Sequence, residues 1–172
     1  FVKDDFALLK TAVSFGDGYG PKLIKRKSSR LRANFKVALS GRYTTNAMLF
    51  RIYYPKARVV YMDFMDIEQA VVSGAVDAGV LIHESILDFD DSLEVEKEMW
   101  DIWVELAGDG LPLPLGGMAV RRSLPLNRAL DIEDILIDGV RVANDRKDEL
   151  CLKLEANSLV RISSQMLSKY LD

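Results

Sequence analysis

The chain has 172 residues, of which 49% are hydrophobic and 28% are charged, and its formal net charge is −3. This is enough apolar material for a globular core, and the composition lacks the low hydrophobicity of disordered chains. The net negative charge and a pI near 5.3 exclude a global attraction to nucleic acids or anionic membranes. We expect a folded protein with neither of these partners.

One stretch is nevertheless locally basic, with Lys22, Lys25, Arg26, Lys27, Arg30, Arg32 and Lys36. A platform for single-stranded nucleic acid would alternate aromatic side chains with such charges, and this stretch does not. We expect a solvated strand edge and loop. A weaker alternative is that these charges attract an anionic substrate.

Cys151 is the single cysteine of the sequence, which fits a reducing cytoplasm, and its helical surroundings favour a packing role. No apolar run approaches the roughly 20 residues that span a bilayer. The first residues, FVKDDFALLK, lack the order of a signal peptide. We expect a soluble, cytoplasmic protein and, because the sequence begins at Phe1, a segment of a longer one.

The first strong turn signal is residues 15–21, Phe-Gly-Asp-Gly-Tyr-Gly-Pro, where three glycines and a proline precede a strand predicted over 22–25. Such a turn brings backbone N–H groups close to a ligand. The glycines alone, however, favour a simple hairpin or crossover turn. Both interpretations stay open.

Residues 35–83 alternate between strand and helix patterns. A strand from Phe35 leads through Ser40-Gly41 into a helix closed by Pro55. A strand over 57–64, a helix over 65–74 and a buried strand over 76–83 follow. This alternation indicates βαβ units and a parallel sheet.

An acidic stretch over 84–98 shows no clear pattern, and a helix follows it. One face of this helix is expected to pack in the core through Met99, Trp100, Trp103, Val104 and Ala107. Residues 111–117, Leu-Pro-Leu-Pro-Leu-Gly-Gly, form an extended connector into a strand over 118–122. Amphipathic helical patterns follow over 127–154 and 163–171.

Two positions carry candidate chemistry. Thr44 and Thr45 lie where a strand passes into a helix, so a hydroxyl can cap the helix while free N–H groups bind an anion, although such caps are common at helices that bind nothing. His83 is the only histidine and follows a buried strand, where α/β sheets expose their ligands. His83 is either a proton-transfer group or a buried histidine whose ring bonds to a carbonyl. In the first case the adjacent Glu84 either assists proton transfer or only faces solvent.

The sequence contains no motif for metal binding, for a serine hydrolase or for nucleotide binding. One histidine and one cysteine with scattered carboxylates give no zinc-ligand spacing. The sequence has no Gly-x-Ser-x-Gly elbow, P-loop or complete dinucleotide fingerprint. We expect no metal and no cofactor.

Four blocks occur together in a specific order: residues 15–21, 40–50 (SGRYTTNAMLF), 74–85 (GAVDAGVLIHES) and 110–122 (GLPLPLGGMAVRR). In order and spacing they resemble the 1,4-dihydroxy-6-naphthoate synthases of the futalosine route to menaquinone. The LPLPLGG connector separates this family from the related chorismate-processing enzymes of the same pathway. The resemblance covers roughly residues 5–122.

The resemblance implies an α/β fold of the type II periplasmic-binding-protein kind, with a ligand cleft between two lobes joined by a hinge. On this basis residues 1–30 are a crossover and hinge segment with the glycine turn, and 31–110 are one α/β lobe. Residues 111–172 are then a return strand and the C-terminal helices of the other lobe. The N-terminal part of that other lobe is expected to lie outside this chain.

The implied activity is that of a lyase, which converts cyclic dehypoxanthine futalosine, a small carboxylated molecule, into 1,4-dihydroxy-6-naphthoate. The family's histidine falls on His83, as the base. The substrate contacts are expected from Thr44, Thr45, Gly18, Tyr19 and Leu115. The alternatives are a non-catalytic protein of this fold that binds a small carboxylate anion and a ligand-sensing domain attached to a DNA-binding segment.

Overall fold

A computed structural model describes residues 3–108, 110–160 and 162–171. The chain forms two compact units, one made of Gly16–Leu113 and the other of Phe1–Phe15 with Pro114–Asp172. The chain therefore passes from one unit to the other twice. Near these two passages, strands β2 (Ser14–Gly16) and β8 (Leu113–Gly116) pair with each other.

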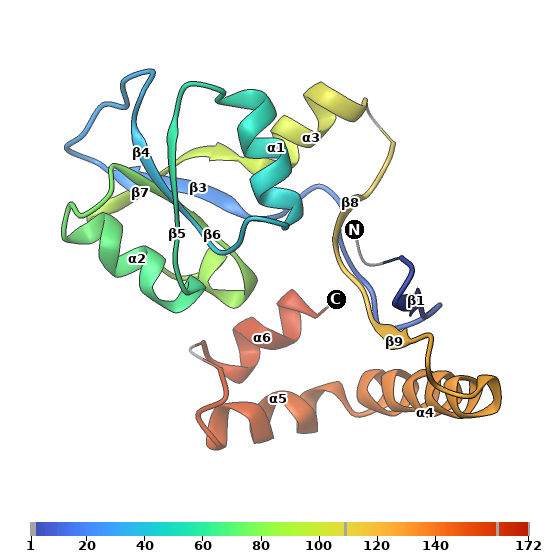
Figure 1. Ribbon diagram of the computed structural model, residues 1–172. Coiled ribbons are helices and arrows are strands. Elements are labelled where there is room, and N and C mark those ends of the chain that lie inside the picture. The colour runs from blue at the N-terminus through green and yellow to red at the C-terminus, as the bar shows by residue number, and fades with distance from the viewer. Residues whose placement is uncertain (1–2, 109, 161, 172) are drawn as a thin grey trace. The chain divides into compact units, whose positions relative to one another are not determined.

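The unit Gly16–Leu113 is built on a five-stranded sheet with the order β5-β4-β6-β3-β7 (Figure 1). Its strands are β3 (Lys22–Arg26), β4 (Lys36–Leu39), β5 (Arg58–Tyr61), β6 (Ala78–Leu81) and β7 (Leu93–Glu98). Strand β4 is parallel to β5 and β6, whereas β3 is antiparallel to both of its neighbours. The predicted parallel βαβ units are confirmed for β4, β5 and β6, and β3 makes the whole sheet mixed.

Three helices cover this sheet: α1 (Thr45–Tyr53), α2 (Phe64–Val72) and α3 (Met99–Ala107). The chain moves from β4 out to β5 and then back past β4 to β6. Right-handed crossovers therefore place α1 and α2 on opposite faces, and α3 packs beside α1 (Figure 1). Because both faces are covered, residues 37–39 and 78–81 are all buried, which explains their uninterrupted apolar sequences.

Strand β7 was not predicted, because its sequence LEVEKE is rich in glutamates, which are disfavoured in strands. Pairing with β3 overrides this preference. Lys25 Nζ bonds to Glu94 and lies 3.5 Å from Glu96 Oε2. This pairing encloses β3 between β6 and β7, so the prediction of a strand edge is wrong for Lys22–Arg26.

Helix α3 buries only part of the predicted face, which is confirmed for Met99. Met99 and Ile102 are fully buried, whereas Trp100 and Trp103 are only half-buried. The indole Nε1 of Trp103 donates to the carbonyl oxygen of Leu111 at 2.8 Å. The aromatic stripe therefore lies at the margin of the core, where an indole keeps a polar partner.

In the other unit, β1 (Phe6–Leu8) pairs antiparallel with β9 (Ala119–Arg121). The predicted C-terminal helices are confirmed as α4 (Leu126–Asp145), α5 (Lys147–Ala156) and α6 (Ser164–Tyr170). Cys151 is buried against Ile162 and Leu167, which confirms its packing role. No described helix combines the length and the apolar character needed to cross a membrane.

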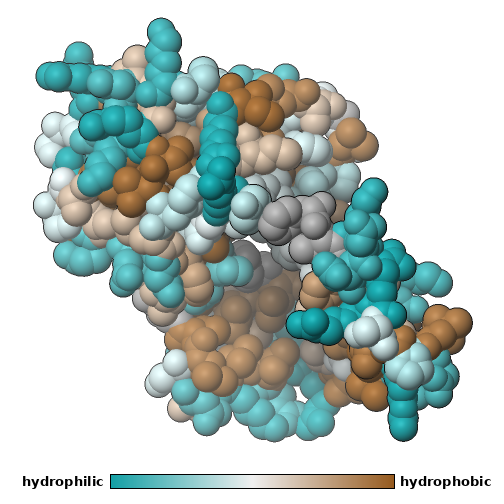
Figure 2. All heavy atoms as spheres, in the orientation of Figure 1, coloured by the Kyte–Doolittle hydropathy of each residue, from teal (hydrophilic) through white to brown (hydrophobic). Residues whose placement is uncertain are grey.

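Helix α4 keeps much of its apolar surface exposed. None of its residues is buried, and the side chains of Ile135 and Val142 are 69% and 49% exposed. Figure 2 shows apolar side chains at the surface of the unit that contains this helix. The amphipathic pattern therefore correctly predicted the helix but not its burial.

Candidate functional site

The fold brings several predicted site residues to one edge of the five-stranded sheet. Strands β4, β5 and β6 are parallel, so their C-terminal ends share this edge, which Thr44-Thr45 and His83 follow directly. Strand β3 is antiparallel to β6, with Lys22 opposite Leu81. The turn before β3, which contains Gly18 and Tyr19, therefore reaches the same edge. Leu115 lies half-buried on β8, in the other unit.

His83 lies just beyond β6 and begins the short 3-10 helix η1 (His83–Ile86). Its side chain is exposed, and its ring nitrogens form no hydrogen bond to any other residue that the structure describes. The alternative of a buried histidine bonded to a carbonyl is therefore wrong. The backbone of His83 has a φ of 57°, a left-handed conformation that is uncommon for a residue other than glycine and that often marks functional positions.

The aromatic ring of Phe64 contacts His83 edge-on, with ring centroids 5.1 Å apart. Phe64 is the first residue of α2, and Asp63 caps this helix by accepting a hydrogen bond from the Met65 N–H at 2.9 Å. No motif of the sequence had singled out Phe64. Its position directly after a strand of the parallel set was the available signal, because these loops meet at one edge.

Thr44 is the N-cap of α1, as predicted. Its Oγ1 accepts a hydrogen bond from the Ala47 N–H at 3.2 Å and donates one to the carbonyl oxygen of Gly41 at 3.0 Å. The Thr44 hydroxyl is thus already bonded within the protein. An anion at this helix start would meet backbone N–H groups and the positive end of the helix dipole.

Asn46, in the first turn of α1, is a further residue that the sequence analysis missed. It is only 7% exposed, and its buried Oδ1 has no hydrogen-bond partner among the described residues. Nearly all buried polar atoms in proteins have a partner. Asn46 therefore holds an unused acceptor beside the helix start.

The glycine turn has structural reasons of its own. A Cβ on Gly16 would lie 2.3 Å from the carbonyl oxygen of Tyr19, so the backbone approach excludes any side chain there. Gly18 has a φ of 74°, which glycine adopts without strain. These two glycines are explained by the turn itself, and a substrate role for Gly18 and Tyr19 stays a prediction.

Lys22 and Glu98 form an ion pair at the same edge, where β3 begins and β7 ends, with 3.7 Å between Lys22 Nζ and Glu98 Oε1. Burial raises the pKa of the Glu98 carboxyl above its ordinary value, and Lys22 opposes this only in part. The other carboxylate oxygen, Oε2, is buried without a hydrogen-bond partner among the described residues. The acidic stretch gave no signal that singled out Glu98.

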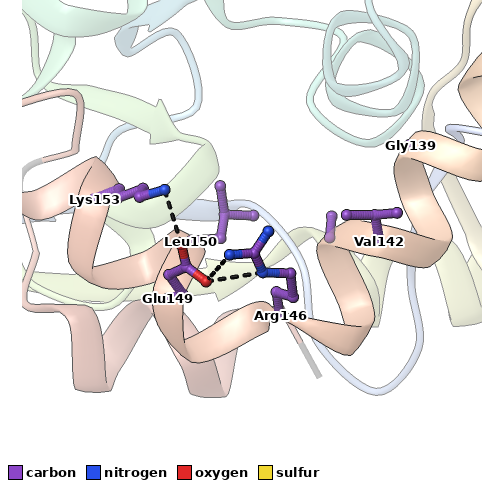
Figure 3. A pocket seen from close by; sticks show the side chains of 7 residues that line it. Gly139, Val142, Arg146, Glu149, Leu150 and Lys153 are labelled. Carbon is purple, nitrogen blue, oxygen red and sulfur yellow. Dashed lines mark hydrogen bonds and ion pairs between the residues drawn. The ribbon is translucent and has the colours of Figure 1, made fainter.

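A separate hollow of about 230 Å³ lies between α4 and α5 and contains none of the predicted site residues. Figure 3 shows Glu149 on one wall, where it bonds to both Arg146 and Lys153, while Val142 and Leu150 supply apolar surface. Exposed ion pairs of this kind contribute little to stability because solvent screens them. The charged side chains that line this hollow pair with one another, and we assign no chemistry to the hollow.

The architecture is that of periplasmic-binding-protein-like proteins of the type II fold, which confirms the predicted fold class. The ligand-binding component of an ABC-type import system from Staphylococcus aureus is similar with a TM-score of 0.65 at 12% identity, over 98% of this chain and 60% of that one. The periplasmic aliphatic sulphonate binding protein of Escherichia coli gives a TM-score of 0.63 at 14% identity, over 99% and 56%. Likeness at such low identity shows the fold alone.

The family described as "Menaquinone biosynthesis" matches residues 1–172, and the chain belongs to this family. The 1,4-dihydroxy-6-naphtoate synthases of Streptomyces coelicolor and Thermus thermophilus are 32% and 34% identical to it, over 84% and 76% of this chain. A solved protein from Archaeoglobus fulgidus has a TM-score of 0.85 at 30% identity, over 98% of this chain and 62% of that one. The predicted family is confirmed.

The chain spans about half the length of the curated relatives it matches, 53% of one and 48% of the other.

Proposed function

We propose that the protein containing this chain is a cytoplasmic carbon–carbon lyase of menaquinone biosynthesis, which converts cyclic dehypoxanthine futalosine into 1,4-dihydroxy-6-naphthoate. Family membership and the names of the curated relatives support this proposal. The observation that carries it is that an exposed imidazole, His83, and the start of helix α1 lie at the same edge of the sheet.

His83 is the proposed base. A neutral imidazole nitrogen can accept a proton from the substrate, and in this proposal proton removal starts the elimination. Two features support this role. The side chain is exposed to a ligand, and the ring of Phe64 restrains its orientation.

The start of α1 is the proposed site for the substrate carboxylate. The dipole of an exposed helix contributes about 0.3–1 kcal/mol to binding an anion there, and direct hydrogen bonds contribute more. In this proposal Thr44 shapes the helix start through its cap, and Thr45 contacts the carboxylate. Gly18 and Tyr19 approach from the turn before β3, and a substrate contact from Leu115 stays a prediction of the family resemblance. The proposed step uses no metal and no cofactor.

The test is chromatographic detection of 1,4-dihydroxy-6-naphthoate after the full-length protein is incubated with cyclic dehypoxanthine futalosine. The variant His83→Asn is the matched comparison, because asparagine tolerates the left-handed backbone of this position. We expect product from the wild type and hardly any from the variant. Equal product from both would keep the function and remove His83 from its role.

A folded wild-type protein that binds the substrate without forming product would instead support a non-catalytic carboxylate-binding or ligand-sensing protein of the same fold. The carboxylate site has its own test, which is the affinity of the Thr45→Val variant for 1,4-dihydroxy-6-naphthoate by calorimetry. Weaker binding is expected. An unchanged dissociation constant would refute the assignment of Thr45.

A further inference from the structure

A second hollow, of about 300 Å³, lies in the unit Gly16–Leu113 and is lined by Arg30, Arg32, Asn34, Phe35, Arg58 and Asp77. These residues precede or begin β4, β5 and β6. They therefore lie at the opposite edge of the sheet from His83. We propose that this hollow binds a phosphate group, carried either by inorganic phosphate or by a phosphate monoester.

Two of the three guanidinium groups of this hollow, those of Arg30 and Arg32, belong to the basic stretch, and the third is that of Arg58 on β5. The other five basic residues of that stretch bond elsewhere: Lys22 to Glu98, Lys25 to Glu94, Arg26 to the carbonyl oxygen of Val71, Lys27 to that of Asp91 and Lys36 to that of Ala75. Within the described ranges, the side chains of Arg30 and Arg32 form no hydrogen bond and no ion pair. Arg58 uses only its Nε, which donates to the carbonyl oxygen of Asn34 at 3.1 Å.

The walls of the hollow are held in place by backbone hydrogen bonds. The Phe35 N–H donates to the carbonyl oxygen of Arg32 at 3.0 Å, and the Arg58 N–H donates to that of Phe35 at 2.8 Å. Asp77 is bonded twice to Lys36: its Oδ2 accepts from the Lys36 N–H at 2.7 Å, and its own N–H donates to the Lys36 carbonyl oxygen at 2.8 Å. The backbone of the site and Asp77 are therefore held in place before a ligand arrives, whereas the exposed side chains of Arg30 and Arg32 become ordered only on binding.

The charge balance favours a doubly charged oxyanion. Three guanidinium groups against the one carboxylate of Asp77 leave the lining with a formal charge of +2. A phosphate monoester carries about −1.5 to −2 charges near pH 7 and offers three acceptor oxygens. The planar fork of each guanidinium matches such oxygens with paired hydrogen bonds. A carboxylate, with one charge and two oxygens, would leave part of this lining unused.

The test is isothermal titration of the full-length protein with inorganic phosphate, at constant ionic strength set with chloride. Glycerol phosphate is titrated in parallel as a monoester, and acetate as a carboxylate. The variants are Arg30→Gln, Arg32→Gln and Arg58→Gln. Arg141→Gln is the matched control, because this substitution removes the same charge at a position on α4, outside the hollow. The Arg141 side chain is 69% exposed and pairs with Asp138.

We expect each hollow variant to weaken phosphate binding about tenfold or more, since each removes a charge-assisted hydrogen bond. The control and His83→Asn should bind phosphate like the wild type, which separates this inference from the proposed function. Tighter binding of glycerol phosphate than of phosphate would identify an ester as the ligand, and the reverse would identify the free anion.

Three results would overturn the inference. The first is phosphate binding that is unchanged in those hollow variants that keep the wild-type melting temperature. The second is an equal weakening in Arg141→Gln, which would show a general effect of net charge. The third is acetate binding as tight as phosphate binding, which would reject the phosphate assignment.

Discussion

The imidazole of His83 and the ring of Phe64 meet with their centroids 5.1 Å apart and their planes inclined by 66°. Phe64 begins α2 after β5, and His83 follows β6, so the contact reaches across the end of β4, which lies between those two strands. Edge-to-face aromatic pairs contribute about 0.5–1.5 kcal/mol beyond the burial of their surface. This contact restrains a histidine whose ring forms no hydrogen bond to any other described residue.

Replacing Phe64 with leucine should therefore impair catalysis more than folding. Loss of about 1 kcal/mol of the aromatic interaction that orients the imidazole corresponds to a fall in kcat of roughly fivefold. Steady-state kinetics of naphthoate formation measure this change. Met65→Leu is the matched control, because Met65 is the next residue of α2 and is 43% exposed. A kcat of Phe64→Leu equal to that of the control would contradict the orienting role.

The cap of α1 predicts a stability difference. Thr44→Ala removes the acceptor of the Ala47 N–H and should lower the free energy of unfolding by about 1 kcal/mol. Thr44→Ser keeps the hydroxyl and should stay close to the wild type. Urea denaturation followed by circular dichroism measures both. Equal stability of the alanine and serine variants would show that the cap contributes nothing.

Two glycines should respond to alanine with opposite signs. A Cβ on Gly79, within β6, would lie 2.4 Å from Ile67 Cγ2 and 3.0 Å from Val71 Cγ2, so Gly79→Ala should destabilise the fold by about 1–3 kcal/mol. Gly139 lies inside α4 with nothing within 4 Å of its Cβ position. Gly139→Ala should stabilise by about 0.5–1 kcal/mol. Thermal denaturation distinguishes the two, and a shift of the same sign in both would refute the argument.

Glu98 should make stability depend on pH. Burial raises the pKa of its carboxyl in the folded state above the ordinary value of 4.5, so the folded protein holds this proton more tightly than the unfolded chain. The resulting stabilisation is complete below the unfolded pKa and is lost as the pH rises through the folded pKa. Glu98→Gln, which cannot ionise, should therefore melt at a higher temperature than the wild type at pH 7.

The difference in melting temperature between the wild type and Glu98→Gln should shrink as the pH approaches 4. Lys22→Met is the complementary variant, because it removes the cation 3.7 Å from Glu98 and should lower the melting temperature more at pH 7 than at pH 4. A wild type that is more stable than Glu98→Gln at pH 7 would mean that the ion pair outweighs the burial of the carboxyl.

Most of the regular structure was predictable from local patterns. The order of strand and helix over residues 35–83, the cap at Thr44 and the turn at Gly18 all follow from short-range preferences that the tertiary structure keeps. The uninterrupted apolar run at 78–81 correctly indicated a strand buried on both faces. The only histidine directly follows this run, which made it a candidate site residue, and the family resemblance then implied its role as the base.

Strand β7 shows where local reasoning fails. Its glutamates argue against a strand, and only the lysines of β3, distant in sequence, compensate for their charge. The same pairing places Glu98 and Lys22 at the edge that holds His83, and the direction of α2 brings Phe64 to the imidazole. The sequence by itself determined most of the elements, the cap at Thr44 and the position of the candidate histidine after a buried strand, since these depend on neighbours within a few positions. Only the tertiary structure decided which strands pair, which charges are neutralised and which side chains meet His83, because those outcomes depend on contacts between segments far apart in the chain.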